Sequence, residues 1–362
     1  MKYLSEIGNI KNKKILVRVD FNVPVFEGNV IDNTKIKATL STIKYLIKKG
    51  AQVVLVTPLG RPKQKRVTSL SVEPIVKEVS KLLKKEILFC SSLQLKEIKK
   101  SVNTLQSKQV LLLENIRFCK YELEVKSNYA QTLSDMFDAF VFDGFGVAHR
   151  STMSTVGLTK YLPSYAGLLL QKEIEILQEI KNKKGGIFII GGAKIKTKLP
   201  TILHLVNKGK KILVGGAIIN SYLHAKGYKV GNSYRTKYVS SKIAKQLDHK
   251  KIVLPIDVVV EHKDGTYSIV DIKKDKKLCQ KEDRILDIGP KTIVKFIKII
   301  EKSSSVIFNG PLGFIEKAPY NIGSVAIASE VANVKKRGGT SVIGGGETIQ
   351  IFNLIKKQKK VT

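Results

Sequence analysis

Four polar segments in the first 150 residues each begin where a run of β-branched or aliphatic residues ends. They read Arg18-Val19-Asp20-Phe21-Asn22, Thr57-Pro58-Leu59-Gly60-Arg61, Glu114-Asn115-Ile116-Arg117 and Asp143-Gly144-Phe145 through to Arg150. Arginine suits the forked recognition of carboxylate or phosphate, although a single arginine of this kind is more often part of a surface ion pair. Three of them on separate strand ends, Arg61, Arg117 and Arg150, favour a small polyanionic ligand that they bind together.

Glycine-rich segments take the same place in the second half of the chain. They are Gly191-Gly192-Ala193-Lys194, Gly215-Gly216-Ala217, Asn309-Gly310-Pro311-Leu312-Gly313 and Gly344-Gly345-Gly346-Glu347-Thr348. Glycine lets backbone N–H groups approach a phosphate, and the helix that follows adds its positive end. One such loop would indicate only tight strand–helix packing, but four indicate a nucleotide site. Lys194 and Lys198 share a helix face there, and Glu347 can hold Mg²⁺.

Three common nucleotide-binding signatures are absent from the sequence. There is no GxxxxGK[ST] segment, so the chain is not a P-loop protein. No GxGxxG follows the first predicted strand, and His149-Arg150 is not followed by the Asp of a protein-kinase catalytic loop.

The elements that must position these groups alternate along the chain. We predict strands at 15–21, 52–57, 86–90, 109–114 and 139–145, with helices at 33–49, 71–84 and 127–137. A longer helix is predicted at 166–181. After it, strands at 186–193, 211–215, 251–260, 305–309 and 340–344 alternate with helices at 196–207, 290–302, 324–336 and 347–359. Residues 261–272 are predicted to form an antiparallel hairpin that turns at Lys263-Asp264-Gly265.

Strands that alternate with helices form parallel sheets covered on both faces. The expected fold class is therefore α/β, with two Rossmann-like, doubly wound parallel-sheet lobes joined by a long helix. The expected bounds are 1–163 for the first lobe, 164–182 for the joining helix and 183–362 for the second lobe. Ligands of such sheets bind at the carboxyl ends of the strands, where both sets of motifs lie.

The amino-acid composition indicates the cellular compartment and limits the classes of binding partner. At 362 residues, 43% of them hydrophobic, the chain is long enough for two domains. Its first residues contain no apolar h-region, so no secretory leader is expected there, and no apolar run in the sequence is long enough to span a membrane. Cys90, Cys119 and Cys279 form no CxxC pair, so a reduced, cytoplasmic location is expected. The net charge of +34 could indicate nucleic-acid binding or a general bias in amino-acid composition. We favour the compositional bias, because the lysines are spread along the chain and no basic block is interleaved with aromatics.

Taken together, the motifs resemble those of the phosphoglycerate kinase family. They are Val17–Pro24, Leu59–Lys63, Leu113–Phe118, Ala148–Arg150 with Ser154–Gly157, Gly191–Lys194, Asp287–Thr292, Asn309–Gly313 and Gly344–Gly346, in the family's order over nearly the whole chain. The resemblance implies two lobes that close on each other. It also implies reversible phosphoryl transfer between 1,3-bisphosphoglycerate and MgADP, giving 3-phosphoglycerate and MgATP in glycolysis, by a protein expected to be a monomer.

The resemblance also implies roles for single residues. Those expected to hold the phosphoglycerate are Asp20, Phe21, Asn22, Lys35, Pro58, Leu59, Gly60, Arg61, Arg117 and Arg150. Those expected to hold ATP or ADP are Lys198, Asn309, Glu316, Gly344, Gly345, Gly346, Glu347 and Thr348, with Glu347 also at the Mg²⁺. Lys35 and Lys194 are the expected catalytic residues, and Lys194 would meet the transferred phosphoryl group. Such cations suit a reaction that depends on positioning and on neutralising spread charge.

Several features depart from the family pattern. Lys35 stands where the family has Arg, so the charge remains but the planar fork is lost and a slower reaction is expected. Pro58 replaces a His that would donate a hydrogen bond to the substrate, and Glu347 replaces an Asp that is one methylene shorter. The family also continues past the position of Thr362 to a glycine loop and a tail. We therefore expect a divergent, C-terminally shortened member.

Two interpretations stay open on these residues. A working phosphotransferase with a carboxyl acceptor is favoured by the retention of Lys194, Lys198, Glu316 and the three strand-end arginines. A degenerate relative, which binds nucleotide or phosphoglycerate with little or no catalysis, is favoured by Lys35, Pro58 and the early end. A third class, a basic nucleic-acid-binding protein, rests on net charge alone.

Overall fold

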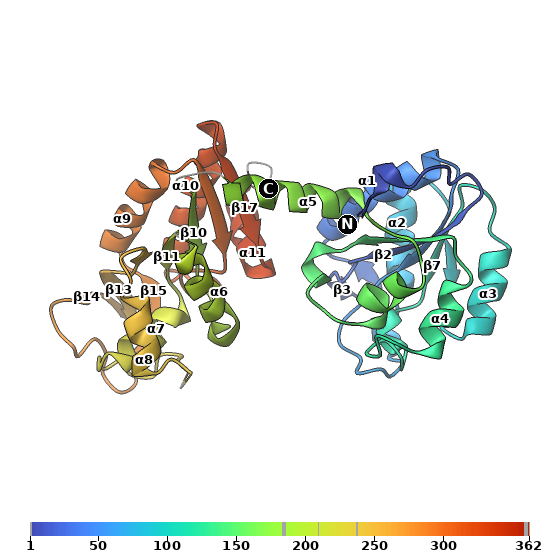
Figure 1. Cartoon of the computed structure of the whole chain (residues 1–362). Coiled ribbons are helices and arrows are strands. Elements are labelled where there is room, and N and C mark those ends of the chain that lie inside the picture. Colours follow the sequence, from blue (N-terminus) through green and yellow to red (C-terminus); the bar gives the residue numbers. More distant parts are fainter. Residues whose placement is uncertain (1, 183–185, 209, 237, 358–360, 362) are drawn as a thin grey trace. The chain divides into compact units, whose positions relative to one another are not determined.

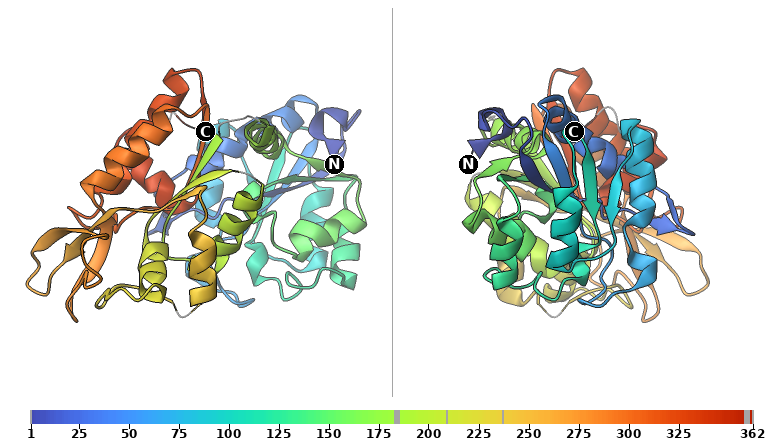
Figure 2. Two further views of the ribbon diagram at one scale, coloured as in Figure 1. Left: turned by 60° about the vertical axis from the view of Figure 1, so that its left-hand side comes forward. Right: turned by 90° about the vertical axis from the view of Figure 1, so that its right-hand side faces the viewer.

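The computed structural model describes residues 2–182, 186–208, 210–236, 238–357 and 361. The chain forms two compact units, Met1–Leu177 and Gln178–Thr362, and the division falls inside helix α5 (Leu168–Asn182). Each unit is built on a parallel sheet with helices on both faces (Figures 1 and 2). The predicted α/β class with two doubly wound lobes is therefore confirmed.

The first unit's sheet has, within the described residues, seven parallel strands in the order β1-β9-β8-β2-β5-β7-β6. They are β1 Lys2–Tyr3, β2 Lys14–Val19, β5 Gln52–Val56, β6 Leu88–Cys90, β7 Val110–Leu113, β8 Ala139–Asp143 and β9 Ser164–Ala166; β3 Val25–Phe26 and β4 Asn29–Val30 form a separate hairpin. Val17 of β2 packs on the side of α1 (Thr34–Lys48) and α2 (Glu73–Leu83), and Leu16 on the side of α3 (Leu95–Asn103) and α4 (Asn128–Ser134). Burial on both faces explains why Ile15, Leu16 and Val17 of β2 are apolar in succession.

The second unit has a five-stranded parallel sheet among the residues described, in the order β12-β11-β10-β16-β17. Its strands are β10 Gly186–Ile190, β11 Lys211–Val214, β12 Ile252–Val253, β16 Ser305–Asn309 and β17 Thr340–Gly344. Helices α6 (Ile195–Asn207) and α7 (Ala217–Ala225) pack on one face. Helices α9 (Pro290–Glu301), α10 (Ile322–Lys336) and α11 (Gly346–Leu354) pack on the other.

The single strand predicted at 251–260 is wrong. Pro255 lies in its middle, and proline has no N–H to donate to a sheet. The segment instead forms β12 in the parallel sheet and β13 (Asp257–Glu261) in a separate antiparallel sheet with β14 (Tyr267–Asp271) and β15 (Arg284–Ile288). The predicted hairpin is confirmed as β13–β14, although its first strand begins earlier than predicted.

Several helices and strands were not predicted, namely α3, α7, α8 (Ser241–Leu247), β1, β3, β4, β9 and β15. The helix predicted at 347–359 ends at Leu354, and residues 358 and 359 of that prediction lie outside the described residues. No helix in the described part of the chain combines the length and the apolar character needed to cross a membrane.

Candidate active site

The carboxyl end of the first unit's sheet gathers the predicted arginines. Burial lowers the pKa of Arg117, and the neighbouring charges of Arg150 and Arg61 lower it too, while Asp20 opposes them. Arg61 and Arg150 are exposed and Arg117 is half-buried. The structure thus brings Arg61 and Arg150 within electrostatic reach of Arg117, which also lies within reach of the carboxylate of Asp20. We call Arg18, Arg61, Arg117 and Arg150 the arginine cluster.

Short polar contacts fix the loops beside this cluster. The amide of Gly60 donates to Asn22 Oδ1 at 2.9 Å, and Arg117 donates to the carbonyl of the same glycine. Lys35 Nζ lies 2.9 Å from Asp20 Oδ2, while Asp20 Oδ1 is buried and has no hydrogen-bond partner among the described residues. Asn22, Arg117, Lys35 and Asp20 are therefore arranged by the fold before any ligand binds.

Three of the predicted substrate residues are part of the floor beneath this end. Phe21, Pro58 and Leu59 are buried. The amide of Phe21 donates to Thr57 Oγ1 at 2.8 Å, and Leu59 exchanges hydrogen bonds with the Asn115 side chain at 3.0 and 2.8 Å. The side chains of this floor support the loops and do not reach outward.

Arg18 and Glu122 form a buried link that the sequence did not predict. Arg18 Nε donates to Ser154 Oγ at 2.9 Å, and Ser154 Oγ donates to Glu122 Oε1 at 2.7 Å. Burial lowers the pKa of Arg18 to about 10, against the charge of Glu122. Burial likewise raises the pKa of Glu122, against the charge of Arg18. Nothing in the local pattern distinguishes Glu122 from a surface glutamate, because its partners are far away in the sequence.

The carboxyl end of the second unit's sheet is built from backbone and two lysines. Lys198 Nζ donates to the carbonyl oxygen of Gly191 and, at 3.1 Å, to that of Asn309. Burial lowers the pKa of Lys198 to about 8; the charge of Glu347 opposes the shift and that of Lys194 adds to it. Lys194 and Glu347 therefore both lie within electrostatic reach of Lys198, as the nucleotide prediction requires.

Glycines at this end are required by close contacts. A Cβ atom at Gly191 would overlap the carbonyl oxygen of Pro311, and one at Gly310 would overlap Lys198 Nζ. The amide of Gly310 donates to Thr348 Oγ1 at 2.7 Å, and Gly345, which precedes α11, has a φ of 93°. Thr348 thus joins two of the glycine-rich loops, and its buried side chain serves the loops themselves.

A cavity of about 320 Å³ lies against these loops, and we call it the glycine cavity. Its lining consists of Gly192, Ala193, Gly216, Ala217, Ile219, Asn220, Tyr234, Pro255, Val258, Ile285–Ile288, Pro311–Phe314, Glu316 and Glu347. The lining is apolar apart from a few groups, which include both predicted carboxylates. This composition is typical of a site for a small organic ligand with a polar end.

The side chains near the glycine cavity indicate what kind of Mg²⁺ site the protein could form. Within the described residues, no three or more His, Cys, Asp or Glu side chains come together as a metal-binding group. Mg²⁺ in phosphate-binding sites is commonly held by one or two carboxylates, with phosphate oxygens and waters as the other ligands. The single carboxylate of Glu347 beside the glycine cavity fits that kind of site and does not fit an all-protein cage.

Comparison with known proteins decides the family. The phosphoglycerate kinase family model matches residues 4–362. The chain belongs to the phosphoglycerate kinase family. It is 37% identical over 374 residues to the phosphoglycerate kinase of Borrelia garinii subsp. bavariensis, a match that covers 100% of this chain and 93% of that protein. It is 36% identical over 353 residues to the phosphoglycerate kinase of Thermosipho africanus, covering 94% and 86%.

Solved phosphoglycerate kinases share the fold of this chain. The enzyme from Coxiella burnetii superposes with a TM-score of 0.82 at 28% identity, over 99% of this chain and 92% of that one. The enzyme from Pyrococcus horikoshii gives 0.84 at 29% identity, over 98% and 91%. The family resemblance drawn from the motifs is therefore confirmed, and with it the prediction of a kinase, a phosphotransferase of glycolysis.

Proposed function

We propose that the protein catalyses reversible phosphoryl transfer between 1,3-bisphosphoglycerate and MgADP, giving 3-phosphoglycerate and MgATP. The observation that carries the proposal is the state of Lys198. Its ammonium is partly buried, hydrogen-bonds to two backbone carbonyls and makes no salt bridge within the described residues. Burial lowers the pKa of Lys198 more than the nearby charge of Glu347 raises it, so the site favours a further anion such as a nucleotide phosphate.

The arginine cluster gives the matching argument for the other substrate. Arg150 and Arg61 lower the pKa of Arg117, which means that their positive charges repel one another in the free protein. A phosphoglycerate would relieve this repulsion and accept paired hydrogen bonds from the guanidinium groups. Asp20 and Asn22, which the fold holds beside the cluster, would accept hydrogen bonds from the hydroxyl group of the glycerate.

The nucleotide would occupy the glycine cavity. Its ribose would meet Glu316 and its phosphates would lie at Gly344–Thr348, Asn309 and the start of α11, where free helix N–H groups favour negative charge. In the direction of ATP synthesis, an oxygen of the ADP β-phosphate attacks the phosphorus of the acyl phosphate. The bond from that phosphorus to the carboxyl oxygen breaks, and 3-phosphoglycerate leaves as a carboxylate.

The protein's part in this step is to position the reactants and to neutralise charge. Lys194 would meet the phosphoryl group in transfer and Lys198 the nucleotide phosphate, while Lys35 would supply charge from the first unit. Mg²⁺ held by Glu347 and the nucleotide would neutralise phosphate oxygens. We also place the protein in the cytoplasm as a monomer; its cysteines, Cys90, Cys119 and Cys279, are all buried and free, which fits a reduced compartment.

A coupled assay tests the proposal. Full-length protein is supplied with MgATP and 3-phosphoglycerate, and the 1,3-bisphosphoglycerate formed is coupled to NADH oxidation. We expect turnover that depends on both substrates. If neither the wild type nor Lys35→Arg turns over while calorimetry detects nucleotide binding, the proposal is overturned in favour of a degenerate family member.

A further inference from the structure

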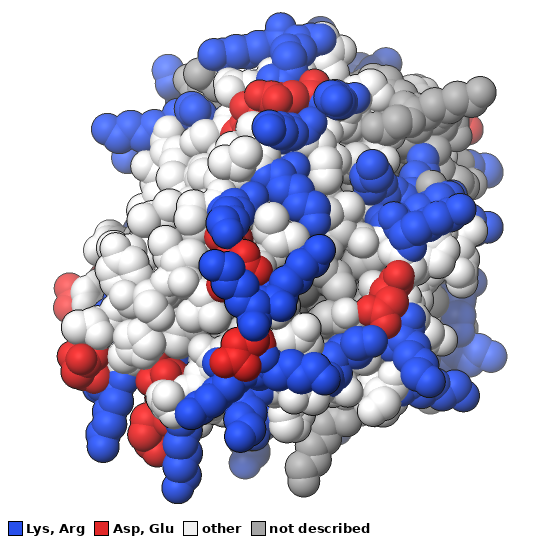
Figure 3. Space-filling model, turned by 90° about the vertical axis from the view of Figure 1, so that its left-hand side faces the viewer, with Lys and Arg blue, Asp and Glu red and all other residues white. Residues whose placement is uncertain are grey.

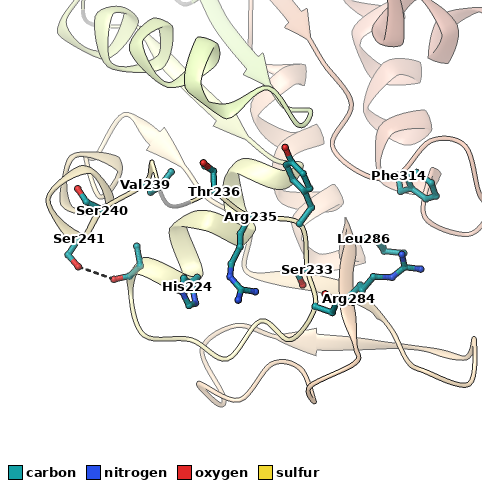
Figure 4. Close-up of a pocket in the computed structure, with 13 residues that line it drawn as sticks. His224, Ser233, Arg235, Thr236, Val239, Ser240, Ser241, Arg284, Leu286 and Phe314 are labelled. Carbon is teal, nitrogen blue, oxygen red and sulfur yellow. Dashed lines mark hydrogen bonds between the residues drawn. The ribbon is translucent and has the colours of Figure 1, made fainter.

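Two surface features of the second unit follow from what is already described. A hollow of about 1060 Å³ adjoins the glycine cavity and shares Tyr234, Leu286 and Phe314 with its wall (Figure 4), so it extends the proposed nucleotide site. The face of this unit drawn in Figure 3 carries many Lys and Arg and few acidic side chains, in keeping with a net charge of +34. A buried group to which the proposed reaction gives no role lies in the first unit, and it is the carboxylate of Glu122.

Glu122 lies in the loop between strand β7 and helix α4 and is only 5% exposed. Both of its carboxylate oxygens accept hydrogen bonds from the segment 152–154. Oε1 accepts from Thr152 Oγ1 at 2.9 Å and from Ser154 Oγ at 2.7 Å, and Oε2 accepts from the amide of Ser154 at 3.2 Å. The backbone carbonyl of Glu122 accepts from the amide of Met153 at 2.8 Å. This one glutamate therefore holds every residue of the segment 152–154.

Arg18 fixes the same segment from another side. Arg18 Nε donates at 2.9 Å to Ser154 Oγ, the atom that in turn donates to Glu122. Burial lowers the pKa of Arg18 and raises the pKa of Glu122, and the charge of each residue opposes the shift in the other. Arg18 thus favours the ionised carboxylate, which is the form that has acceptors for all three side-chain hydrogen bonds.

The segment held in this way is joined to Arg150, a member of the arginine cluster. Thr155 Oγ1 donates to the carbonyl of Arg150 at 2.6 Å and accepts from the amide of Thr152 at 3.0 Å. The side chain of Arg150 is exposed and makes no salt bridge within the described residues. Its direction therefore depends on its backbone and, through Thr152 and Thr155, on Glu122.

We propose that Glu122 is a positioning residue for phosphoglycerate binding, which holds the segment 152–155 and thereby directs Arg150 toward the ligand. The inference rests on the proposed function, since it takes the phosphoglycerate to bind at the arginine cluster. Buried charges contribute little net stability, because the cost of removing them from water offsets their attraction. A carboxylate bonded on both oxygens does fix geometry, and an arginine held in place before binding loses less conformational freedom when the ligand arrives. The effect should therefore fall on affinity and not on the phosphoryl step.

Calorimetry with 3-phosphoglycerate on the full-length protein tests this role. Glu122→Gln keeps the size of the side chain but leaves one acceptor oxygen in place of two. We expect the Kd for 3-phosphoglycerate to rise about tenfold while the Kd for ADP stays unchanged. In the coupled assay the same variant should raise the KM for 3-phosphoglycerate and leave kcat within about twofold of the wild type. Glu124→Gln is the matched control and should change neither constant, because Glu124 is an exposed glutamate of the same loop.

A double variant separates positioning from support of the fold. Arg150→Ala alone should weaken 3-phosphoglycerate binding, and the addition of Glu122→Gln should weaken it by less than about twofold more, because the positioned residue is gone. A further tenfold loss in the double variant would overturn the inference. An unchanged Kd in folded Glu122→Gln, or an equal loss of ADP binding, would overturn it too. Thr152→Val removes one hydrogen bond to Glu122 and replaces Glu122→Gln if circular dichroism shows the latter to be unfolded, with an expected rise in Kd of about threefold.

Failure of this role and failure of the proposed function give different results. A wild type that binds 3-phosphoglycerate without turnover contradicts the proposed function, and the Kd values of the Glu122 variants still decide the positioning role. Normal turnover together with an unchanged Kd in Glu122→Gln contradicts the positioning role alone. A wild type that binds no 3-phosphoglycerate contradicts both.

Discussion

The carboxyl ends of the two sheets are built on opposite plans. In the first unit, side-chain charges define the site: Arg18 and Arg117 lie within electrostatic reach of Asp20, and Arg18 is linked through Ser154 to the buried Glu122. In the second unit, the backbone defines the site, because glycines allow loops to touch and Lys198 bonds to two carbonyls. Two units of similar fold are thus suited to bind anions in different ways, one through side-chain charges and one through backbone groups. Mutations in the two units should therefore have different effects on activity and stability.

The largest effect is expected where the backbone contacts are tightest. Gly191→Ala forces a methyl group onto the carbonyl oxygen of Pro311, and neither backbone segment can move freely. We expect the free energy of unfolding of the second unit to fall by about 3 kcal/mol. Gly346→Ala is the control, since its new Cβ would meet no atom within 4 Å, and it should stay within about 1 kcal/mol of the wild type.

Urea unfolding followed by far-UV circular dichroism measures both variants, because the chain contains no Trp to serve as a fluorophore. Equal stability of Gly191→Ala and Gly346→Ala would contradict the claim that backbone contact shapes this end of the sheet.

The next effect is expected in the arginine cluster, on activity and not on stability. Arg117→Ala removes a guanidinium that the other arginines repel and that donates to Gly60. We expect kcat/KM for 3-phosphoglycerate to fall by roughly 30-fold, with the KM for ATP little changed. Arg66→Ala, an exposed arginine outside the cluster, should have no effect in the same coupled assay. An equal fall in kcat/KM for 3-phosphoglycerate and for ATP would mean that Arg117 stabilises the fold and does not bind phosphoglycerate.

Local sequence patterns explain which parts of the fold and of the sites could be predicted from the sequence. Glycine-rich strand ends and strand-end arginines have local signatures, so the sequence could predict that both sets of motifs lie at the carboxyl ends of strands. Glu122 has none, because its link to Arg18 through Ser154 joins residues that lie far apart in the chain. The prediction of one long strand across Pro255 was wrong. The residues on both sides of Pro255 are apolar, but proline has no N–H to donate, so the ladder of sheet hydrogen bonds is interrupted there.

A smaller, pH-dependent effect is expected in the second unit. Burial lowers the pKa of Lys198 to about 8, and a phosphate binds the charged form. As the pH rises from about 7 to about 9, most of the charged form is lost in the free protein, so ADP affinity at the proposed nucleotide site should fall about tenfold. Lys198→Arg stays charged throughout and should give a flat profile. Calorimetry across this range measures both, and a wild-type profile as flat as that of the arginine variant would contradict the buried-ammonium argument.

The smallest effect is expected at Lys35, in the first unit. Lys35 bonds only one oxygen of Asp20, at 2.9 Å, and the other oxygen is buried without a partner among the described residues. The forked guanidinium of Lys35→Arg can bond both oxygens and still present a charge to the phosphoryl group. We expect kcat to rise about threefold in the coupled assay, while Lys37→Arg, on the exposed side of the same helix, leaves it unchanged. If Lys35→Arg lowers kcat, the single hydrogen bond from Lys35 to Asp20 contributes to catalysis in this protein. The site in the first unit would then function with fewer paired hydrogen bonds than a forked guanidinium would make.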